Sequence, residues 1–187
     1  TMALPHDMVG MATTNTDPWM TVPGGKGPIM GTNPIAYAIP AGTERPIFLD
    51  IATSSVAVTK ILAAKALGKR LPEKWLVDDA GRPTDDPTNY PAQGALLPMA
   101  GHKGYGLGLF VDLLCAGMSM GAWSRDTFVK NDGARIAQFF AAMRTDLFGK
   151  PEEIAAHVEE ILEGVRNSAK AEGHDRIYIH GEKEVER

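Results

Sequence analysis

The segment GHKGYGLGLFVDLL, residues 101–114, carries the glycine pattern that points most directly to phosphate chemistry in this sequence. Four glycines fall within its first eight residues, and an apolar run follows. A glycine-rich turn that opens into a helix can hold an anion against backbone amides and the positive end of the helix dipole. Lys103 would lie in the first turn, where a cation is unfavourable unless it shares an anion with the helix. Lys103 is therefore a candidate phosphate or carboxylate contact, although many such lysines simply face water.

The glycine spacing itself does not match the two common nucleotide-binding motifs. Residues 104–108 read G-x-G-x-G, whereas the Rossmann turn requires G-x-G-x-x-G directly after a strand. Residues 25–31 read G-x-G-x-x-x-G without a helix to follow, and no Gly-Lys pair precedes Ser or Thr, as a P-loop requires. The spacing alone favours a structural interpretation, in which small residues let a helix approach its neighbour closely.

The elements that would position these residues alternate irregularly between strand and helix. Apolar segments bounded by turn-forming residues predict strands at 8–14, 34–40, 46–52, 137–143 and 176–181. Helical periodicity predicts helices at 53–68, 101–114 and 151–165. Thr53 or Ser54 would cap the first helix and Gly68 would end it. Because a helix does not follow every strand, we expect an α/β fold whose sheet is not purely parallel.

Composition excludes several classes of protein. The 187 residues suffice for one sizeable domain, and 44% hydrophobic with 22% charged residues is typical of a packed globular protein. A net charge of −4 argues against nucleic-acid binding. The single cysteine, Cys115, excludes a disulfide within the chain and favours a reducing, cytoplasmic compartment. The apolar run 107–120 is interrupted by Asp112 and too short for a membrane span, and no secretory signal or metal-ligand cluster is recognisable.

Four segments in a fixed order resemble one enzyme family: GTNPIAYAIP, LDIATS, LLPMAGHKGYGLGLFVDLL and RIYIHGEKE. Together with VGMATTNTDP and VPGGKGPIMGTNP, they extend over nearly the whole chain and are similar to the malate/L-lactate dehydrogenases of the second type. The resemblance implies an oxidoreductase that moves hydride between NAD or NADP and a small 2-hydroxy or 2-oxo acid. It also implies a largely antiparallel, non-Rossmann cofactor-binding domain flanked by helices, which residues 1–187 would form, and pairing into a homodimer.

The resemblance places the cofactor on scattered loops. Its implied contacts are Thr16, Asp50, Ile51, Ala52, Lys103, Gly181, Glu182 and Lys183. Their chemistry fits, because Asp50 can accept hydrogen bonds from ribose hydroxyls and Lys103 can meet phosphate charge. Ordinary interpretations exist as well, with Asp50 as a helix cap and Thr16 as part of a turn. Glu182 and Lys183 would then form a solvated tail.

Candidate substrate contacts are fewer. Thr32, Asn33 and His102 could reach a substrate, although Asn before Pro is also a common turn opener. Hydride transfer at a carbinol carbon needs a general acid/base, most often histidine. None of the five histidines matches the family's catalytic motif. We therefore expect the catalytic histidine upstream of this chain, which opens without an initiator Met as if cut from a longer one.

Two functions remain open at this point. One is an NAD(P)-dependent dehydrogenase of the malate/lactate type, and the alternative is a catalytically inactive nucleotide-binding fragment or pseudoenzyme. Cofactor choice depends on the loops near the ribose, where NADP needs a cation for its 2′-phosphate. No arginine lies in LDIATS or NTDP, and the carboxylate of Asp50 suits a 2′-hydroxyl, which favours NAD. Lys60, in the helix that follows, is the residue that could reverse this preference.

Overall fold

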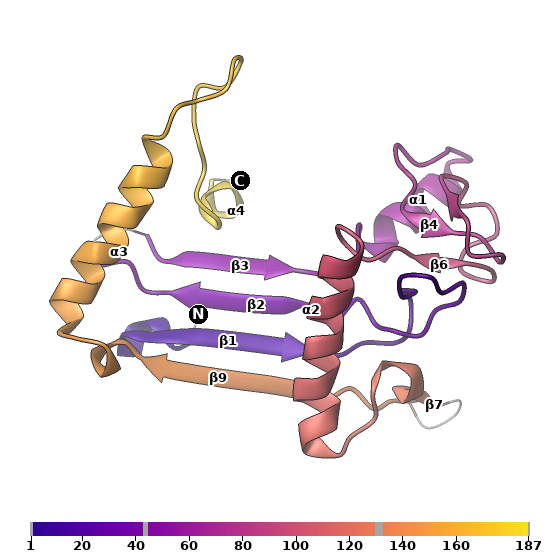
Figure 1. The fold of residues 1–187 in the computed structure, drawn as a ribbon, viewed down its shortest axis with the longest axis horizontal. Helices are drawn as coiled ribbons and strands as arrows, with labels where there is room; N and C mark the ends of the chain where they lie inside the picture. The colour runs from indigo at the N-terminus through magenta and orange to yellow at the C-terminus, as the bar shows by residue number, and fades with distance from the viewer. Residues whose placement is uncertain (1, 43–44, 130–132, 187) are drawn as a thin grey trace. The chain divides into compact units, whose positions relative to one another are not determined.

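The computed structural model describes residues 2–42, 45–129 and 133–186 (Figure 1). Its largest sheet has four strands in the order β3-β2-β1-β9. These strands are β1 (Met8–Thr14), β2 (Ile35–Ile39), β3 (Ile47–Ile51) and β9 (Gln138–Arg144). Neighbouring arrows in Figure 1 point in opposite directions, so this sheet is antiparallel. The expected α/β fold with a sheet that is not purely parallel is thereby confirmed.

Four of the five predicted strands lie in this sheet, each within one residue of its expected bounds. β2 illustrates the reason, because Pro34 and Pro40 flank its five residues and cannot donate to a strand ladder. The prediction of a strand at 176–181 is wrong: the structure assigns no strand to these residues. A strand needs a neighbour to accept its backbone hydrogen bonds. The Ile179 amide instead donates to the carboxylate of Glu182 at 3.0 Å.

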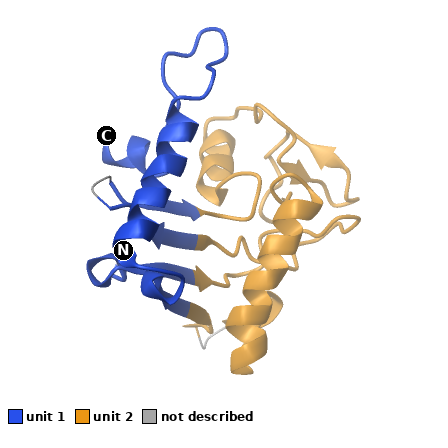
Figure 2. Ribbon diagram, turned by 60° about the vertical axis from the view of Figure 1, so that its left-hand side comes forward, with its two compact units in different colours: residues 1–12, 36–50, 140–187 blue, residues 13–35, 51–139 orange. Residues whose placement is uncertain are grey.

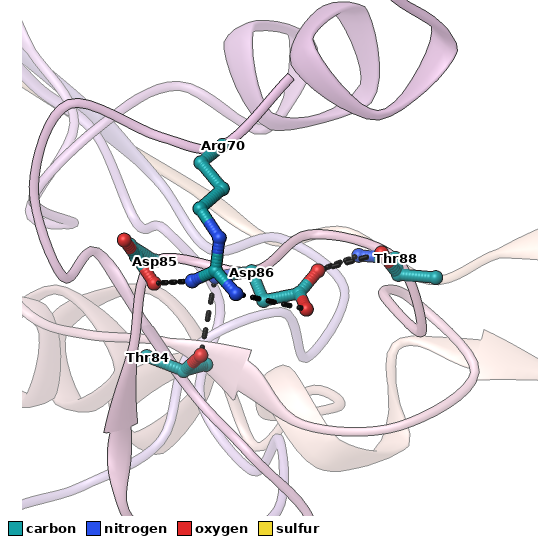
Figure 3. A network of polar contacts seen from close by, with 5 residues as sticks. All are labelled: Arg70, Thr84, Asp85, Asp86 and Thr88. Atoms are coloured by element: carbon teal, nitrogen blue, oxygen red, sulfur yellow. Dashed lines mark hydrogen bonds and ion pairs between the residues drawn. The ribbon is translucent and has the colours of Figure 1, made fainter. Parts of the chain in front are cut away.

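Short antiparallel ladders complete the β structure. They join β4 (Leu76–Val77) to β5 (Pro83–Thr84) and β6 (Ala95–Leu96), and β7 (Phe128–Val129) to β8 (Gly133–Ala134). The polar segment around β5 is fixed by side chains (Figure 3). Arg70 forms ion pairs with Asp85 and Asp86, and Asp86 also accepts hydrogen bonds from Thr88. A segment without hydrophobic periodicity is therefore ordered by charge pairs at the surface.

The first long helix, α1 (Val58–Ala66), begins later than the sequence predicts. Neither Thr53 nor Ser54 caps it, because its N-cap is Ala57, which makes no side-chain cap bond. Thr53 is fully buried and its hydroxyl donates to the carbonyl of Thr32, while Ser54 forms a β-bridge with Pro98. The polar residues before the helix are thus used by long-range contacts. Gly68, at a φ of 62°, lies two residues after the helix, as predicted.

The remaining helices follow the predicted pattern more closely. α2 (His102–Asp112) continues into a π-helical turn, η2 (Leu113–Gly117), and α3 extends over Pro151–Arg166. Pro151 occupies the first turn of α3, as expected. A four-residue helix, α4 (Glu182–Val185), ends the described chain, and three 3₁₀ turns lie at η1 (Leu4–His6), η3 (Ser124–Asp126) and η4 (Thr145–Leu147). No helix in the described part of the chain is long and apolar enough to span a bilayer.

The chain divides into two compact units (Figure 2). Unit 1 comprises Thr1–Ala12, Ala36–Asp50 and Phe140–Arg187, and unit 2 comprises Thr13–Ile35 and Ile51–Phe139. Unit 2 has a hydrophobic core in which Met20, Ile61 and Leu96 are fully buried. In unit 1, Leu162 of α3 and Ala38 of β2 are buried. Each unit holds some of the residues that the sequence nominates for binding.

Candidate functional site

The glycines of α2 are explained mainly by close packing within unit 2. A Cβ on Gly104 would lie 2.4 Å from the carbonyl oxygen of Thr53 and 2.5 Å from the amide nitrogen of Met99. A Cβ on Gly108 would lie 3.0 Å from the hydroxyl of Thr53. By contrast, a Cβ on Gly106 would meet nothing within 4 Å. Two of these glycines therefore let α2 lie directly against the chain at Thr53, as the structural interpretation predicts.

The start of α2 offers a side chain rather than a ring of free amides to an anion. The amide of Gly104 donates to the Met99 carbonyl at 2.7 Å, and that of Lys103 to the Ala100 carbonyl at 3.5 Å. These first-turn donors already have acceptors in the protein, unlike those of a phosphate-binding loop. The side chains of His102 and Lys103 are exposed at this turn. Lys103 is consequently the charged group that the turn presents to solvent.

Hydrogen bonds bring three of the predicted binding segments together in unit 2. The Thr32 amide donates to the hydroxyl of Thr16 at 2.9 Å. The amide of Thr53 donates to the carbonyl of Thr32 at 2.8 Å, and the amide of Met99 donates to the carbonyl of Thr53 at 2.9 Å. Thr16, the residues Ile51 and Ala52 that precede Thr53, and the start of α2 therefore lie along one connected set of loops.

Asn33 is at the centre of this arrangement and is fully buried. Its amide group donates to the carbonyl of Gly108 at 2.9 Å, and its side-chain oxygen accepts from the amide of Thr16 at 3.0 Å. The hydroxyl oxygen of Ser124 lies 3.2 Å from the same oxygen. All of these bonds hold the loop and α2 together. The side chain of Asn33 thus supports neighbouring segments. Thr32, the other candidate substrate contact in this loop, is partly exposed.

A buried carboxylate, Asp112, extends this network and was not nominated by the sequence. It accepts hydrogen bonds from the side-chain amide of Asn15 at 3.2 Å, from the amide of Ser124 at 3.0 Å and from the Ser124 hydroxyl at 2.6 Å. Asn15 is fully buried as well and accepts a bond from the amide of Ala137. The one sequence signal was a single aspartate interrupting the apolar run 107–120.

Unit 1 places Asp50 and the Gly181–Lys183 segment on the same face of strand β3. Asp50 is exposed, so the carboxylate is accessible, and α1 begins only at Val58, which removes the interpretation of Asp50 as its cap. Phe48, two residues before Asp50, lies on the same face of the strand. A Cβ on Gly181 would lie 2.7 Å from the ring of Phe48, and Gly181 has a φ of 94°. Only glycine therefore fits at position 181 without a shift.

Glu182 is not part of a solvated tail, because it is buried and carries an ion-pair cluster with Arg166, Arg176 and Glu186. Burial alone would raise the pKa of the Glu182 carboxyl. The amide of Ile179 and the guanidinium groups of Arg166 and Arg176 outweigh that effect, and the pKa lies below its usual range. Glu182 is therefore held as a carboxylate, whereas the neighbouring side chain of Lys183 is exposed.

A cavity of about 810 Å³ also opens on unit 1, a volume typical of small-molecule pockets. Small residues of the sheet, among them Gly10, Ala12 and Ala38, line it together with Phe48. The ionisable side chains among its described lining residues are His6, Tyr37 and Asp50. The cavity is thus predominantly apolar, with the carboxylate of Asp50 among its few charged groups.

All five histidines are exposed: His6, His102, His157, His174 and His180. His157 pairs with Glu160 across 3.1 Å on α3. Within the described ranges, no three or more His, Cys, Asp or Glu side chains gather as metal ligands would. None of these histidines belongs to the buried network of unit 2. His102 precedes Lys103 and His180 precedes Gly181, so two of the histidines adjoin proposed binding residues.

Comparisons with known proteins identify the family of this chain. A family model described as malate/L-lactate dehydrogenase matches residues 1–187. A malate dehydrogenase of Pyrococcus horikoshii is 38% identical over 192 residues, covering 97% of this chain and 52% of that protein. A (2R)-3-sulfolactate dehydrogenase (NADP(+)) of Chromohalobacter salexigens is 43% identical over 112 residues, covering 60% of this chain and 33% of that protein.

Comparison with solved structures also finds a malate dehydrogenase. The crystal structure of malate dehydrogenase from Entamoeba histolytica aligns with a TM-score of 0.89 and 31% sequence identity, covering 99% of this chain and 55% of that one. The chain therefore spans about half the length of the Pyrococcus and Entamoeba proteins.

Proposed function

Because this chain belongs to the malate/L-lactate dehydrogenase family, we propose that it provides the cofactor-binding part of an NAD(P)-dependent oxidoreductase. The enzyme would transfer hydride between the nicotinamide and a small 2-hydroxy or 2-oxo acid. Relatives named for malate and sulfolactate support this substrate class, since both are 2-hydroxy acids with a second acidic group. We further propose that two copies pair, as the family resemblance implies.

The observation that carries the proposal is the connection of Thr16, Thr32 and Thr53 to the start of α2 in unit 2. It joins loops that are far apart in sequence to the segment that leads into α2, whose first turn carries the exposed Lys103. In the proposed site, Lys103 meets phosphate charge, and the backbone at Ile51 and Ala52 contacts the cofactor. Scattered loops of this kind would replace the single glycine turn of a Rossmann fold.

Unit 1 holds other residues that the resemblance implies as cofactor contacts. The exposed carboxylate of Asp50 is suited to accept hydrogen bonds from ribose hydroxyls. The ammonium of Lys183 is suited to phosphate. The backbone of Gly181 lies against Phe48, on the face of β3 that also carries Asp50. The available groups therefore include donors, a carboxylate acceptor and cations, which is the set that a dinucleotide requires.

The acid/base step calls for a group near neutral pKa, which histidine supplies most often. We propose that this histidine comes from the part of the family's length that this chain does not span. His102, exposed beside Lys103, is the alternative within the chain. When bound, the cofactor gives or takes the hydride, while these residues would hold it and orient the substrate, with Thr32 as a candidate substrate contact.

Cofactor choice is proposed as NAD or NADP without preference. The absence of arginine from LDIATS favours NAD, but the relative from Chromohalobacter salexigens carries NADP(+) in its name. An exposed Lys60 on α1 remains a candidate partner for a 2′-phosphate. The second candidate function is nucleotide binding without catalysis. The observation that favours it is that none of the five histidines in this chain matches the family's catalytic motif.

Binding and turnover measured on the same purified chain test the proposal. We expect NADH and NADPH to bind in a fluorescence titration, and no turnover with malate, lactate or sulfolactate. Failure of both cofactors to bind would overturn the proposal. Turnover by the chain alone would contradict the assignment of the acid/base elsewhere, and its loss in His102→Gln would then assign the step to His102.

A further inference from the structure

We propose that Glu182 is a positioning residue for the cofactor. Its carboxylate, held by Arg166 and Arg176, fixes Gly181–Lys183 so that the ammonium of Lys183 can meet cofactor phosphate. The inference rests on the proposed cofactor-binding function. It assigns different roles to two neighbouring residues that the family resemblance treats alike, and it adds Arg166 and Arg176 as residues that act through Glu182.

Both oxygens of Glu182 are engaged by the protein. Oε1 accepts from Nε and Nη2 of Arg166, at 3.0 and 2.9 Å. Oε2 accepts from Arg176 at 3.2 Å and from the amide of Ile179 at 3.0 Å. The side chain is only 10% exposed. A carboxylate with this many donors is oriented by them and has little surface left for a ligand.

These contacts connect elements that the chain separates. Arg166 is the last residue of α3, whereas Glu182 is the first residue of α4. On its other side, the segment rests on strand β3, because Gly181 lies against the ring of Phe48 with no room for a Cβ. The backbone at 181–182 is thus held both by the ion pairs and by the sheet, and the direction of residue 183 follows from it.

Lys183 differs from Glu182 in being available to a ligand. Its side chain is exposed, and Nζ lies 4.6 Å from the centroid of the Tyr178 ring. The guanidinium of Arg176 lies 4.5 Å from the same centroid. Arg166 and Arg176 balance the charges of Glu182 and Glu186, so the Glu182 carboxylate does not cancel the attraction of Lys183 for an anion.

Two readouts on the intact chain separate positioning from direct contact. The first is amide hydrogen exchange in residues 176–186, and the second is the dissociation constant for NADH and for NADPH. Glu182→Gln is expected to speed exchange in that segment and to weaken binding at least tenfold. The matched control is Asp85→Asn, which removes the partner of Arg70 in unit 2 and is expected to change neither readout. Arg176→Gln, a milder change at a half-exposed side chain, should shift both readouts in the direction of Glu182→Gln.

Lys183 variants complete the comparison. Lys183→Ala is expected to weaken cofactor binding without faster exchange, and Lys183→Arg to restore the binding. If the wild-type chain binds cofactor and Glu182→Gln leaves the dissociation constant unchanged, the positioning role is overturned. It is also overturned if binding weakens with no change in exchange, since that result indicates direct contact. If the wild-type chain binds neither NADH nor NADPH, the proposed function fails and this inference fails with it.

Discussion

At the scale of single residues, the interior of unit 2 contains a carboxylate held by uncharged donors. Asp112 is 4% exposed and receives its hydrogen bonds from Asn15 and Ser124. The Ser124 hydroxyl also lies 3.2 Å from the side-chain oxygen of Asn33, which in turn binds Thr16 and α2. The network thus fixes the loop of Thr16 relative to the helix that begins beside Lys103. Its role is to hold in place the segments that we propose bind the cofactor.

Replacing Asp112 is expected to destabilise the fold. Asp112→Ala removes the acceptor of the Ser124 amide and of one N–H of the Asn15 side chain, a loss of about 1–3 kcal/mol for each unsatisfied group. Urea unfolding would measure the change in the free energy of unfolding. Asp79→Ala, at an exposed position in the surface loop, is the control and should stay within about 0.5 kcal/mol of wild type. Equal stability of the two variants would contradict a structural role for Asp112.

Lys103→Ala is expected to weaken cofactor binding about tenfold, the equivalent of roughly 1.4 kcal/mol for one lost charged contact. The amides of Lys103, Gly104 and Tyr105 in the first turn of α2 already have acceptors, so they cannot compensate for the missing ammonium. Titration of the chain with NADH measures the effect, and Lys69→Ala, at another exposed lysine of unit 2, serves as the control. In a protein of the family's full length, the cofactor KM should rise more than kcat falls. A collapse of kcat at constant KM would instead place Lys103 in the chemical step.

Sequence motifs identified the family at this scale, and the family match confirms that identification. The motifs could not reveal the hydrogen-bond network that holds the proposed site, because these bonds join residues distant in sequence. Ser124 and Asn33, for example, are 91 residues apart. Asn33 precedes a proline and therefore resembled an ordinary turn residue. Nothing in its local sequence indicates that its side chain binds α2.

At the scale of elements, two glycines of α2 allow a matched test of close packing. Gly104→Ala is expected to destabilise the chain, because the new Cβ would meet backbone atoms of Thr53 and Met99 that cannot move aside easily. Gly106→Ala, on an open face of the same helix, is expected to stabilise it by about 0.5–1 kcal/mol through reduced backbone entropy. Thermal unfolding of both variants gives the comparison. Similar shifts in the two variants would contradict the packing of α2 described above.

The contribution of Glu182 to the stability of the fold should decrease at acidic pH. Its pKa in the folded protein is lowered, so ionised Glu182 stabilises the fold at neutral pH. That contribution is lost as the pH falls through the folded-state pKa, below the usual glutamate value of about 4.3. We therefore expect Glu182→Gln to lower Tm at pH 7 and the gap to wild type to narrow on acidification. A gap that is constant with pH would contradict the ion-pair cluster as its source.

Elements were predictable where local signals and long-range contacts agree. β2 lies between two prolines, and the start of α3 carries Pro151 with Glu152 and Glu153, so both were located correctly. The start of α1 was misplaced because Thr53 and Ser54 bind distant segments. The apolar segment 176–181 has strand-like composition, yet whether it pairs depends on a neighbour that no local pattern specifies.

At the scale of the whole molecule, each unit exposes apolar side chains that a longer protein or a second copy could cover. On α2 and the turn that follows, Leu107, Phe110, Leu113 and Met118 are 39–74% exposed. In unit 1, Phe140 is 69% exposed. Several large apolar side chains exposed on one helical segment are typical of interfaces. It is consistent with a chain that spans about half the length of its relatives.

The purified chain is therefore expected to self-associate with rising concentration. Phe110→Lys combined with Leu113→Lys should reduce the self-association, because both positions are exposed and a charge there opposes apolar contact. Sedimentation velocity over a concentration series measures the effect, and Lys170→Glu, at an exposed position beyond α3, is the control. A wild-type chain that stays monomeric at all concentrations would contradict the expectation.

The ion pair between Arg166 and Glu182 has a consequence for protein engineering. It closes a loop whose first part, residues 167–176, is exposed throughout. The entropic cost of a closed loop grows slowly with its length, by only about 0.6 kcal/mol for a doubling. We therefore expect a peptide tag or fluorophore-binding sequence inserted near Gly173 to be tolerated, with the ion pair between Arg166 and Glu182 retained. The same position would report, from within one chain, whether the ends of the loop stay together when a nucleotide arrives.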